Sequence, residues 1–223
     1  MALVSDGLKG DLISDMSLER VFQKHVIDGA SYFFKSARSK IDDEYQLRHE
    51  LADCLDININ DVIIVGSAKL GFSIKTKQLI PFDYSYESTS NKRLRSDIDI
   101  AVVSRELFGK ITKDVFSLSR RYDPHWINEK WLLNQYYQDA EKLRKPIFSS
   151  YCEYVSKGWI RPDYLPLEYQ KDAPWKKVIE EWREKLEYRK ISIGIYSEWF
   201  YLKNYQIKGL EVLQNNIKGL HYV

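Results

Sequence analysis

Hydrophobic residues recur at steps of three and four along two early segments of the chain, which is the spacing of one face of an α-helix. In residues 17–40 this stripe consists of Leu18, Val21, Phe22, His25, Val26, Phe33 and Phe34. Ser17 precedes the stripe and is a suitable N-cap. Residues 41–55 carry a second stripe that ends before the polar stretch 56–61. The pattern therefore predicts one helix over 17–40 and another over 41–55.

Three short apolar runs have the composition of buried strands. Residues 62–65 read Val-Ile-Ile-Val and run directly into Gly66-Ser67. Residues 97–103 begin with an alternation of acidic and aliphatic residues, which places Asp97 and Asp99 on one face of the strand. Residues 191–195 form the third predicted strand.

The remaining segments predict helices and connecting loops. Apolar spacing favours helices over 127–145 and 175–189, and Ser197 is the predicted cap of a last helix that reaches about residue 218. Residues 75–95 show no clear period and are expected to form a loop or a hairpin. Residues 158–166 are expected to be a rigid loop bounded by prolines.

The order of these elements predicts an α+β fold, with a small mixed sheet flanked by helices. No internal repeat or low-complexity linker divides the 223 residues, so we expect a single domain over 1–223 with a helical C-terminal extension over roughly 127–223. Hydrophobic residues make up 44% of the chain, which suffices for one sizeable core. The formal net charge of +2 argues against a strongly basic coat for nucleic acid, although it permits a local basic patch.

The sequence also argues against a membrane protein and against a zinc site. No apolar run approaches the roughly 20 residues that span a bilayer, and the first residues lack the pattern of a signal peptide. We therefore expect a cytoplasmic protein whose two cysteines, Cys54 and Cys152, are reduced. Neither cysteine has a neighbour at metal-ligand spacing, and the four histidines are scattered.

Two features carry chemistry: the turn Gly66-Ser67 after one strand and the pair Asp97 and Asp99 on another. A glycine after a strand lets backbone amides approach a phosphate, and a serine hydroxyl can add a hydrogen bond. Two carboxylates at i and i+2 repel each other unless a cation lies between them. Mg²⁺ accepts one or two carboxylates together with phosphate oxygens. The combination is typical of phosphoryl or nucleotidyl transfer.

These two segments resemble the signature of the DNA polymerase beta-like nucleotidyltransferase superfamily. The resemblance covers roughly residues 45–115 and rests on the strand that ends in Gly66-Ser67 and the strand that carries Asp97-Ile98-Asp99. It implies a nucleotidyltransferase fold, Mg²⁺ or Mn²⁺ as cofactor held by Asp97 and Asp99, and a nucleoside triphosphate (NTP) bound at Gly66 and Ser67. Lys69, two residues further on, could offset phosphate charge or could be a solvated surface lysine.

The sequence departs from the superfamily pattern in the spacing of the two motifs. Thirty positions separate Ser67 from Asp97, whereas many members have a much shorter spacer. The extra length falls in 75–95 and holds the basic residues Lys75, Lys77, Lys92, Arg93 and Arg95. This segment could contact the triphosphate or an acceptor, or it could be a solvated surface loop.

The third carboxylate of the superfamily, which helps to activate the attacking hydroxyl, has no counterpart on the strand 191–195. We expect Asp163 to take this role, because prolines on both sides would hold it rigidly. The alternatives are Asp123, Glu153 and Glu198. Arg161 could also be no more than the salt-bridge partner of Asp163.

The function expected from the sequence is Mg²⁺-dependent transfer of a nucleotide from an NTP to an acceptor. The acceptor could be RNA, such as tRNA, or a protein, because stand-alone chains of this size resemble the transferases of bacterial toxin–antitoxin and phage-defence systems. A small-molecule acceptor is the alternative within the enzyme class. A relative that binds a nucleotide or a partner without turnover is the alternative outside it. The sequence does not predict the oligomeric state.

Overall fold

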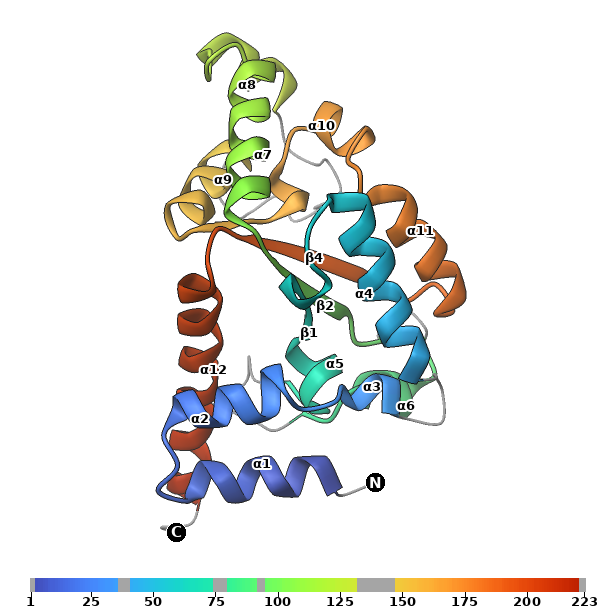
Figure 1. Cartoon of the computed structure of the whole chain (residues 1–223), viewed down its shortest axis with the longest axis vertical. Coiled ribbons are helices and arrows are strands. Elements are labelled where there is room, and N and C mark those ends of the chain that lie inside the picture. The colour runs from blue at the N-terminus through green and yellow to red at the C-terminus, as the bar shows by residue number, and fades with distance from the viewer. Residues whose placement is uncertain (1–2, 36–40, 74–79, 92–94, 132–146, 221–223) are drawn as a thin grey trace.

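The computed structural model describes residues 3–35, 41–73, 80–91, 95–131 and 147–220. Within these residues, four strands form one mixed sheet in the order β1-β2-β4-β3. The strands are β1 (Val62–Val65), β2 (Ile98–Val103), β3 (Trp159–Ile160) and β4 (Ile191–Tyr196). Helices cover both faces of the sheet (Figure 1), so the fold is α+β with a small mixed sheet, as predicted.

β2 and β4 are the two inner strands of the sheet, and β2 carries Asp99. β2 pairs antiparallel with β1, where Val65 is opposite Asp99, and parallel with β4, where Asp99 is opposite Ser192. The two-residue strand β3 adds to the outer edge of β4 in antiparallel orientation. Because β2 and β4 are parallel, the chain between them must cross from one end of the sheet to the other, and helices occupy this connection.

The helices come from both ends of the chain and from the long β2–β4 connection. The N-terminal ones are α1 (Leu3–Ile13), α2 (Leu18–Phe22), a π-helical turn (Gln23–Ile27), α3 (Tyr32–Lys35) and α4 (Ile41–Leu55). Those that follow β1 are α5 (Gly66–Leu70) and α6 (Tyr84–Thr89). The β2–β4 connection contains α7 (Arg105–Leu118), α8 (Pro124–Lys130), α9 (Ile147–Ser156), α10 (Leu167–Lys171) and α11 (Lys176–Lys185). The chain closes with α12 (Trp199–Leu220).

Alternation along the strands divides the buried apolar residues into two cores. Ile64, Ile98, Ile100 and Ile193 face one side, where residues of α4, α7 and α11 pack against them. The opposite face packs against α1, α2 and α12. Its strand residues in that core are Ile63, Val65, Ala101, Val103 and Tyr196. Asp99 belongs to this second face and is the only residue of β2 that is not buried.

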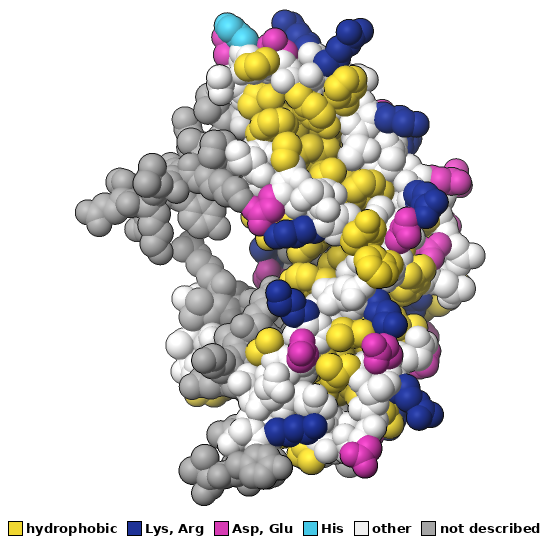
Figure 2. All heavy atoms as spheres, turned by 90° about the vertical axis from the view of Figure 1, so that its left-hand side faces the viewer, with side chains coloured by type: hydrophobic (Ala, Val, Ile, Leu, Met, Phe, Trp, Pro, Cys, Tyr) yellow, Lys and Arg dark blue, Asp and Glu magenta, His cyan; other side chains and the backbone are white. Residues whose placement is uncertain are grey.

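The surface over α7 to α9 is richer in hydrophobic side chains than the surface below it. Figure 2 shows that these side chains gather in the upper part of the face on the α12 side, whereas lower down they mix with Lys, Arg, Asp and Glu. Phe116, Trp199 and Phe200 are among the large apolar residues with substantial exposure. No helix in the described part of the chain is both long and apolar enough to cross a bilayer.

The predicted strands and several predicted helices are confirmed. The helix over 41–55 and the strand over 62–65 both have the predicted bounds. The strand predicted over 191–195 extends one residue further, to Tyr196. The helix predicted over 175–189 ends at Lys185 as α11. β2 starts at Ile98, so Asp97 lies just before the strand.

The single helix predicted over 17–40 is wrong. Ser17 does cap α2, since its hydroxyl accepts from the amide of Arg20, but the α-helix ends at Phe22 and continues as the π-helical turn. The helix is then interrupted around Gly29, before α3 begins. A Cβ at Gly29 would lie 2.8 Å from the carbonyl oxygen of His25, so the position favours glycine. Residues 36–40 lie outside the described residues.

Other differences concern the connections. Most of the helix predicted over 127–145 lies outside the described residues, and α8 covers only its beginning. The segment 75–95, where described, contains α6 and is neither a pure loop nor a hairpin, although Phe72 and Pro81 form a bridge at its base. The loop predicted over 158–166 contains β3 and a 3₁₀ turn at Pro162–Tyr164. The predicted last helix is confirmed as α12, but it begins at Trp199, and the hydroxyl of Ser197 donates to the carbonyl of Gly158 instead of capping it.

Trp182 joins α11 to α4 through a hydrogen bond inside the larger core. Its side chain is 2% exposed, and its indole nitrogen donates to Oε2 of Glu50 at 2.6 Å. We expect Trp182→Phe to lower the free energy of unfolding by about 2 kcal/mol, because a hydrogen bond to a charged acceptor is lost. Urea unfolding of this variant, alone and in a Glu50→Ala background, measures the effect. An equal loss in both backgrounds would show that the hydrogen bond contributes nothing.

Candidate functional site

The turn after β1 lies directly against the Asp99 carboxylate. Gly66 follows Val65, which pairs with Asp99, and has a φ of +67°. A Cβ built on Gly66 would lie 2.8 Å from Oδ2 of Asp99. Both the left-handed backbone and the close approach require glycine here. The prediction that the two strands are neighbours and bring the Gly-Ser turn to the acidic pair is therefore confirmed for Asp99.

Ser67 lies in the first turn of α5, the short helix that starts at Gly66. The residue before this helix, Val65, is buried, extended and provides no side-chain cap for the amides of the first turn. Ser67 itself is partly exposed. The first turn of α5 therefore presents backbone amides and a hydroxyl group close to the Asp99 carboxylate.

Asp97, directly before β2, lies on the same side of the chain as Asp99. Ile98 between them is fully buried in the opposite core, whereas both aspartates are partly exposed. The ammonium of Lys190 lies 3.0 Å from Oδ2 of Asp97. Lys190 directly precedes β4, and the amide of Ile98 donates to its carbonyl. The parallel pairing of β2 and β4 therefore delivers a cation to Asp97.

Two tyrosines lie within electrostatic reach of Asp99. Burial raises the pKa of the Tyr196 phenol, and Tyr205 and Asp99 add to that shift. Burial also raises the pKa of Tyr205, with contributions from Tyr154 and Asp99. Both phenols therefore stay protonated at neutral pH and can donate hydrogen bonds, whereas neither is suited to act as a base.

An indole ring covers the strand beside this acidic site. Trp159 stacks on Tyr196 at 5.3 Å between ring centroids, and Tyr205 approaches the same indole at 4.9 Å. A Cβ on Gly194 would lie 2.5 Å from the indole nitrogen of Trp159, so glycine is required for the indole to lie on the strand. The Asp99 face of the sheet thus carries an aromatic wall made by Trp159, Tyr196 and Tyr205.

Lys69 is buried, which makes the solvated-lysine alternative wrong. Lys69 is 4% exposed, and burial lowers the pKa of its ammonium group. The charged groups that act most strongly on its ammonium are Glu44 and Arg48 of α4. These neighbours place the ammonium towards α4. A contact between Lys69 and a phosphate stays a prediction.

Asp163 is held in an ion pair by Arg161. The guanidinium donates to both carboxylate oxygens of Asp163, at 3.1 Å and 2.6 Å, and its carbon lies 4.7 Å from the centroid of the Tyr164 ring. The side chain of Asp163 is 53% exposed. The role of Asp163 as the third acid stays a prediction, and it requires that the pair with Arg161 open.

The three alternative acids have other partners. Asp123 caps α8, since its carboxylate accepts from the amide of Trp126. Glu153 pairs with Lys157 one turn further along α9. Glu198 pairs with Arg105 beyond the carboxyl ends of β2 and β4, at the end of the sheet opposite to Asp97. On β4 itself, the residue opposite Asp99 is Ser192, so the neighbouring strand offers a hydroxyl and not a carboxylate.

The described residues contain no group of three His, Cys, Asp or Glu side chains that could hold a metal ion by themselves. Asp97 and Asp99 provide two carboxylates on one side of the strand. This number suits Mg²⁺, which usually keeps several waters and takes its other ligands from substrate phosphates. The cation that Asp97 attracts in the structure is the ammonium of Lys190.

A surface cavity of about 660 Å³ lies at the other end of the sheet. It is lined mainly by the segments that follow β2 and β4, including Ser104, Arg105, Ser197, Glu198 and Trp199. None of Gly66, Ser67, Asp97 and Asp99 lines it. The cavity and the acidic site are therefore separate features.

Sequence reasoning missed Lys190, Ser192 and the aromatic wall. The signal for the first two is weak, because a lysine before a strand and a serine within one are common. Only the parallel register of β2 and β4 shows that they lie beside Asp97 and Asp99. Trp159 and Tyr205 come from segments that the sequence could not bring together.

Comparison with known proteins identifies no relative, since no protein-family model, no curated protein and no solved structure matches the chain. The chemistry of the site therefore has to be argued from its own residues.

Gly66 can be tested against a glycine that has space around it. We expect Gly66→Ala to lower the free energy of unfolding by about 1–2 kcal/mol, because alanine is strained in the left-handed region. Its Cβ should also displace the Asp99 carboxylate. Gly109→Ala is the control, since no atom lies within 4 Å of a Cβ there and alanine in α7 should stabilise by roughly 0.5–1 kcal/mol. Urea unfolding distinguishes the two, and equal shifts would contradict the tight approach at Gly66.

Proposed function

We propose that this protein is a Mg²⁺-dependent nucleotidyltransferase, which moves a nucleotide from an NTP to an acceptor. The observation that carries the proposal is the contact between the Gly66 turn and Asp99. Backbone amides suited to phosphate and a carboxylate suited to Mg²⁺ meet at one point of the sheet. A purely structural turn would not need an aspartate at the one position of β2 that is not buried.

Each residue of the site has a defined task in this proposal. The turn of Gly66 and Ser67 would bind the triphosphate, through backbone amides and the serine hydroxyl. Asp97 and Asp99 would hold Mg²⁺, and bound Mg²⁺ supplies positive charge that offsets the developing charge on the phosphates. Lys190 shows that the site attracts positive charge, because its ammonium already lies beside Asp97.

The acceptor hydroxyl needs a group that removes its proton. Asp163 is the proposed base, and its carboxylate must leave Arg161 to act. Tyr196 and Tyr205 are unsuited to this task, because their raised pKa values keep them protonated. Tyr205, which is exposed, can instead contact the bound substrate, whereas Tyr196 is buried.

A second candidate function is nucleotide binding without turnover. The observation that favours it is Ser192, which occupies the position opposite Asp99 on the neighbouring strand. If no acid completes the site, Mg²⁺–NTP would still bind, and the protein would act by changing its contacts with a partner.

The acceptor class is proposed from the resemblance of the sequence alone. An RNA such as a tRNA, or a protein, in a toxin or phage-defence system is our first proposal, and a small molecule is the second. Of the basic residues in segment 75–95, the structure describes Arg95, whose side chain is 8% exposed and bound to Glu187. Lys75, Lys77, Lys92 and Arg93 lie outside the described residues.

Mg²⁺–NTP should stabilise the folded protein. At roughly a hundredfold its Kd, the ligand adds about 2.7 kcal/mol, which raises the Tm of a chain of this size by roughly 5–10 °C. Asp97→Asn and Asp99→Asn should each abolish this shift. Without ligand, both variants should stay within about 1 kcal/mol of wild type, because lower repulsion between the carboxylates offsets the loss of the exposed Lys190–Asp97 pair. Thermal unfolding with and without Mg²⁺ and each of ATP, GTP, CTP and UTP measures both effects.

The matched control is Asp172→Asn, which removes an exposed carboxylate after α10. This variant should respond to Mg²⁺–NTP as wild type does. A wild type that shows no shift with any of the four nucleotides, or an Asp99→Asn variant that shifts equally, would exclude a nucleotide–metal site at these aspartates.

Transfer itself is tested with α-labelled NTPs, Mg²⁺ and a cell extract. We expect label to enter one molecular species, with release of pyrophosphate, and to be lost in Asp99→Asn. Asp163→Asn should reduce the rate by about a hundredfold or more if it removes the general base, and should leave the thermal shift intact. A wild-type rate in Asp163→Asn would eliminate Asp163 as the base. Stabilisation by Mg²⁺–NTP without any transfer of label would favour the second candidate function.

A further inference from the structure

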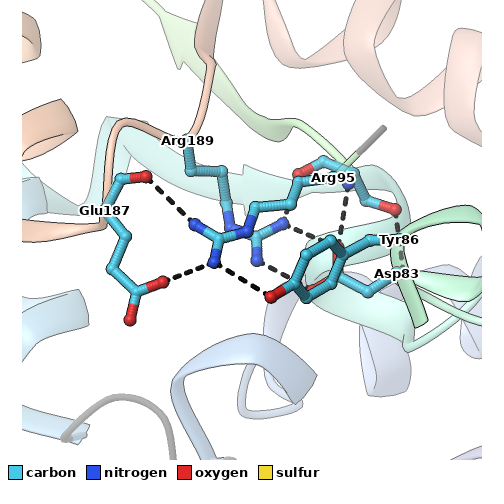
Figure 3. A network of polar contacts seen from close by, with 6 residues as sticks. Asp83, Tyr86, Arg95, Glu187 and Arg189 are labelled. Atoms are coloured by element: carbon cyan, nitrogen blue, oxygen red, sulfur yellow. Dashed lines mark hydrogen bonds and ion pairs between the residues drawn. The ribbon is translucent and has the colours of Figure 1, made fainter. Parts of the chain in front are cut away.

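A buried ion pair lies immediately behind the acidic site. Asp83 is 1% exposed and Arg189 is 4% exposed. The guanidinium donates to both carboxylate oxygens, at 2.7 Å and 2.8 Å, so the pair is bidentate (Figure 3). The guanidinium carbon also lies about 5 Å from the ring centroids of Phe33 and Phe82, at 5.0 Å and 5.1 Å. These rings close the pair off from water.

The pair binds every polar group of Ser96, the residue directly before Asp97. The amide of Ser96 donates to Oδ1 of Asp83 at 2.9 Å, and its hydroxyl accepts from the amide of Asp83 at 3.0 Å. Its carbonyl accepts from Arg189 at 2.7 Å. The backbone that leads into Asp97 therefore has one defined position relative to Arg189.

A second ion pair repeats this arrangement one residue earlier. Arg95 donates to the carboxylate of Glu187 at 2.6 Å and to its backbone carbonyl at 3.0 Å. Its guanidinium carbon lies 4.7 Å from the ring centroid of Tyr86, on α6 (Figure 3). Residues 95, 96 and 97 are thus bonded in turn to residues 187, 189 and 190. Side-chain contacts therefore hold the segment before β2 against the segment before β4, ahead of the point where the two strands begin to pair.

Stability alone does not account for a buried pair of this kind. Removing two charges from water costs several kcal/mol per ion, and well-packed hydrophobic replacements are often equally or more stable. In addition, Asp83 has a left-handed backbone with a φ of +64°. What the pair provides is geometry, because a bidentate guanidinium–carboxylate contact has a fixed direction and distance.

We propose that Arg189 and Asp83 are positioning residues for the metal site, which fix Ser96 and so hold Asp97 and Asp99 in the arrangement that binds Mg²⁺. This assignment rests on the proposed function. It also gives the long spacer between Ser67 and Asp97 a role, since Asp83 lies within that spacer and hydrogen-bonds Ser96 at its end. The segment supports the carboxylates from behind, as outer partners commonly support metal ligands.

The test uses a variant that removes both charges together. Asp83→Gly/Arg189→Met leaves no unpaired buried charge, and glycine adopts the left-handed backbone of residue 83 without strain, so we expect the variant to fold. At a fixed NTP concentration, the Mg²⁺ concentration that gives half-maximal stabilisation should be at least about tenfold higher in this variant than in wild type. This is the usual effect of losing an outer partner of a metal ligand. Arg189→Lys, which keeps the charge but not the bidentate contact, should show a smaller increase.

Hydrogen exchange provides a readout that does not depend on metal. The amide of Ser96 should exchange faster in the double variant than in wild type, whereas the amides of β1 should keep their protection. Trp182→Phe is the control for lost stability away from the site, and its Mg²⁺ dependence should equal that of wild type.

The outcomes separate this assignment from the proposed function. A wild type that responds to Mg²⁺–NTP, together with a double variant that needs the same Mg²⁺ concentration, overturns the positioning role alone. Unchanged exchange at Ser96 in the double variant overturns it as well. A wild type without any Mg²⁺–NTP response overturns the proposed function, and the positioning role with it.

Discussion

The pairing of β2 between β1 and β4 is the constraint on which the candidate site depends. Five of the six residues of β2 are buried, and only Asp99 is not. Because side chains alternate along a strand, a shift of the register by one residue would bury Asp99 in the larger core and put Ile98 or Ile100 at its partly exposed position. The apolar residues on both sides of the sheet therefore fix the register, and the register sets Asp99 against Gly66 on β1 and Ser192 on β4.

The same constraint explains why the surroundings of the acidic pair are polar and ordered. Asp97 lies just outside the sheet, where the ladder of backbone hydrogen bonds no longer positions the chain. The ion pairs of Arg189 and Arg95 take over this task at residues 95 and 96. An irregular segment next to a core must satisfy its backbone groups, and here a carboxylate and a guanidinium do so.

The site is asymmetric in charge and in shape. On the side of β1, the Gly66 turn offers amides, and on the side of β4 the chain offers a hydroxyl and an ammonium. The aromatic wall lies further along the same face, and Asp163 follows β3 at the edge of the sheet. An acid opposite Asp99 would have completed a cluster of three carboxylates. Because a serine stands there instead, the proposed transfer reaction needs a base from elsewhere, for which Asp163 is the proposed residue.

The sequence by itself determined β1, β2 and β4, the helix over 41–55 and the pairing of Gly66 with the acidic strand, because each depends on local apolar patterns or on a motif within a few residues. It did not predict α7 or α9, and it merged α2 and α3 into one helix, because a π-helical turn and a glycine break leave the apolar spacing nearly unchanged. Lys190, which pairs with Asp97, and Arg189, which binds the carbonyl of Ser96, each lie 93 positions further along the chain than the residue they contact. Only the tertiary structure decided these contacts, since a parallel crossover brings distant residues together in a register that no local pattern encodes.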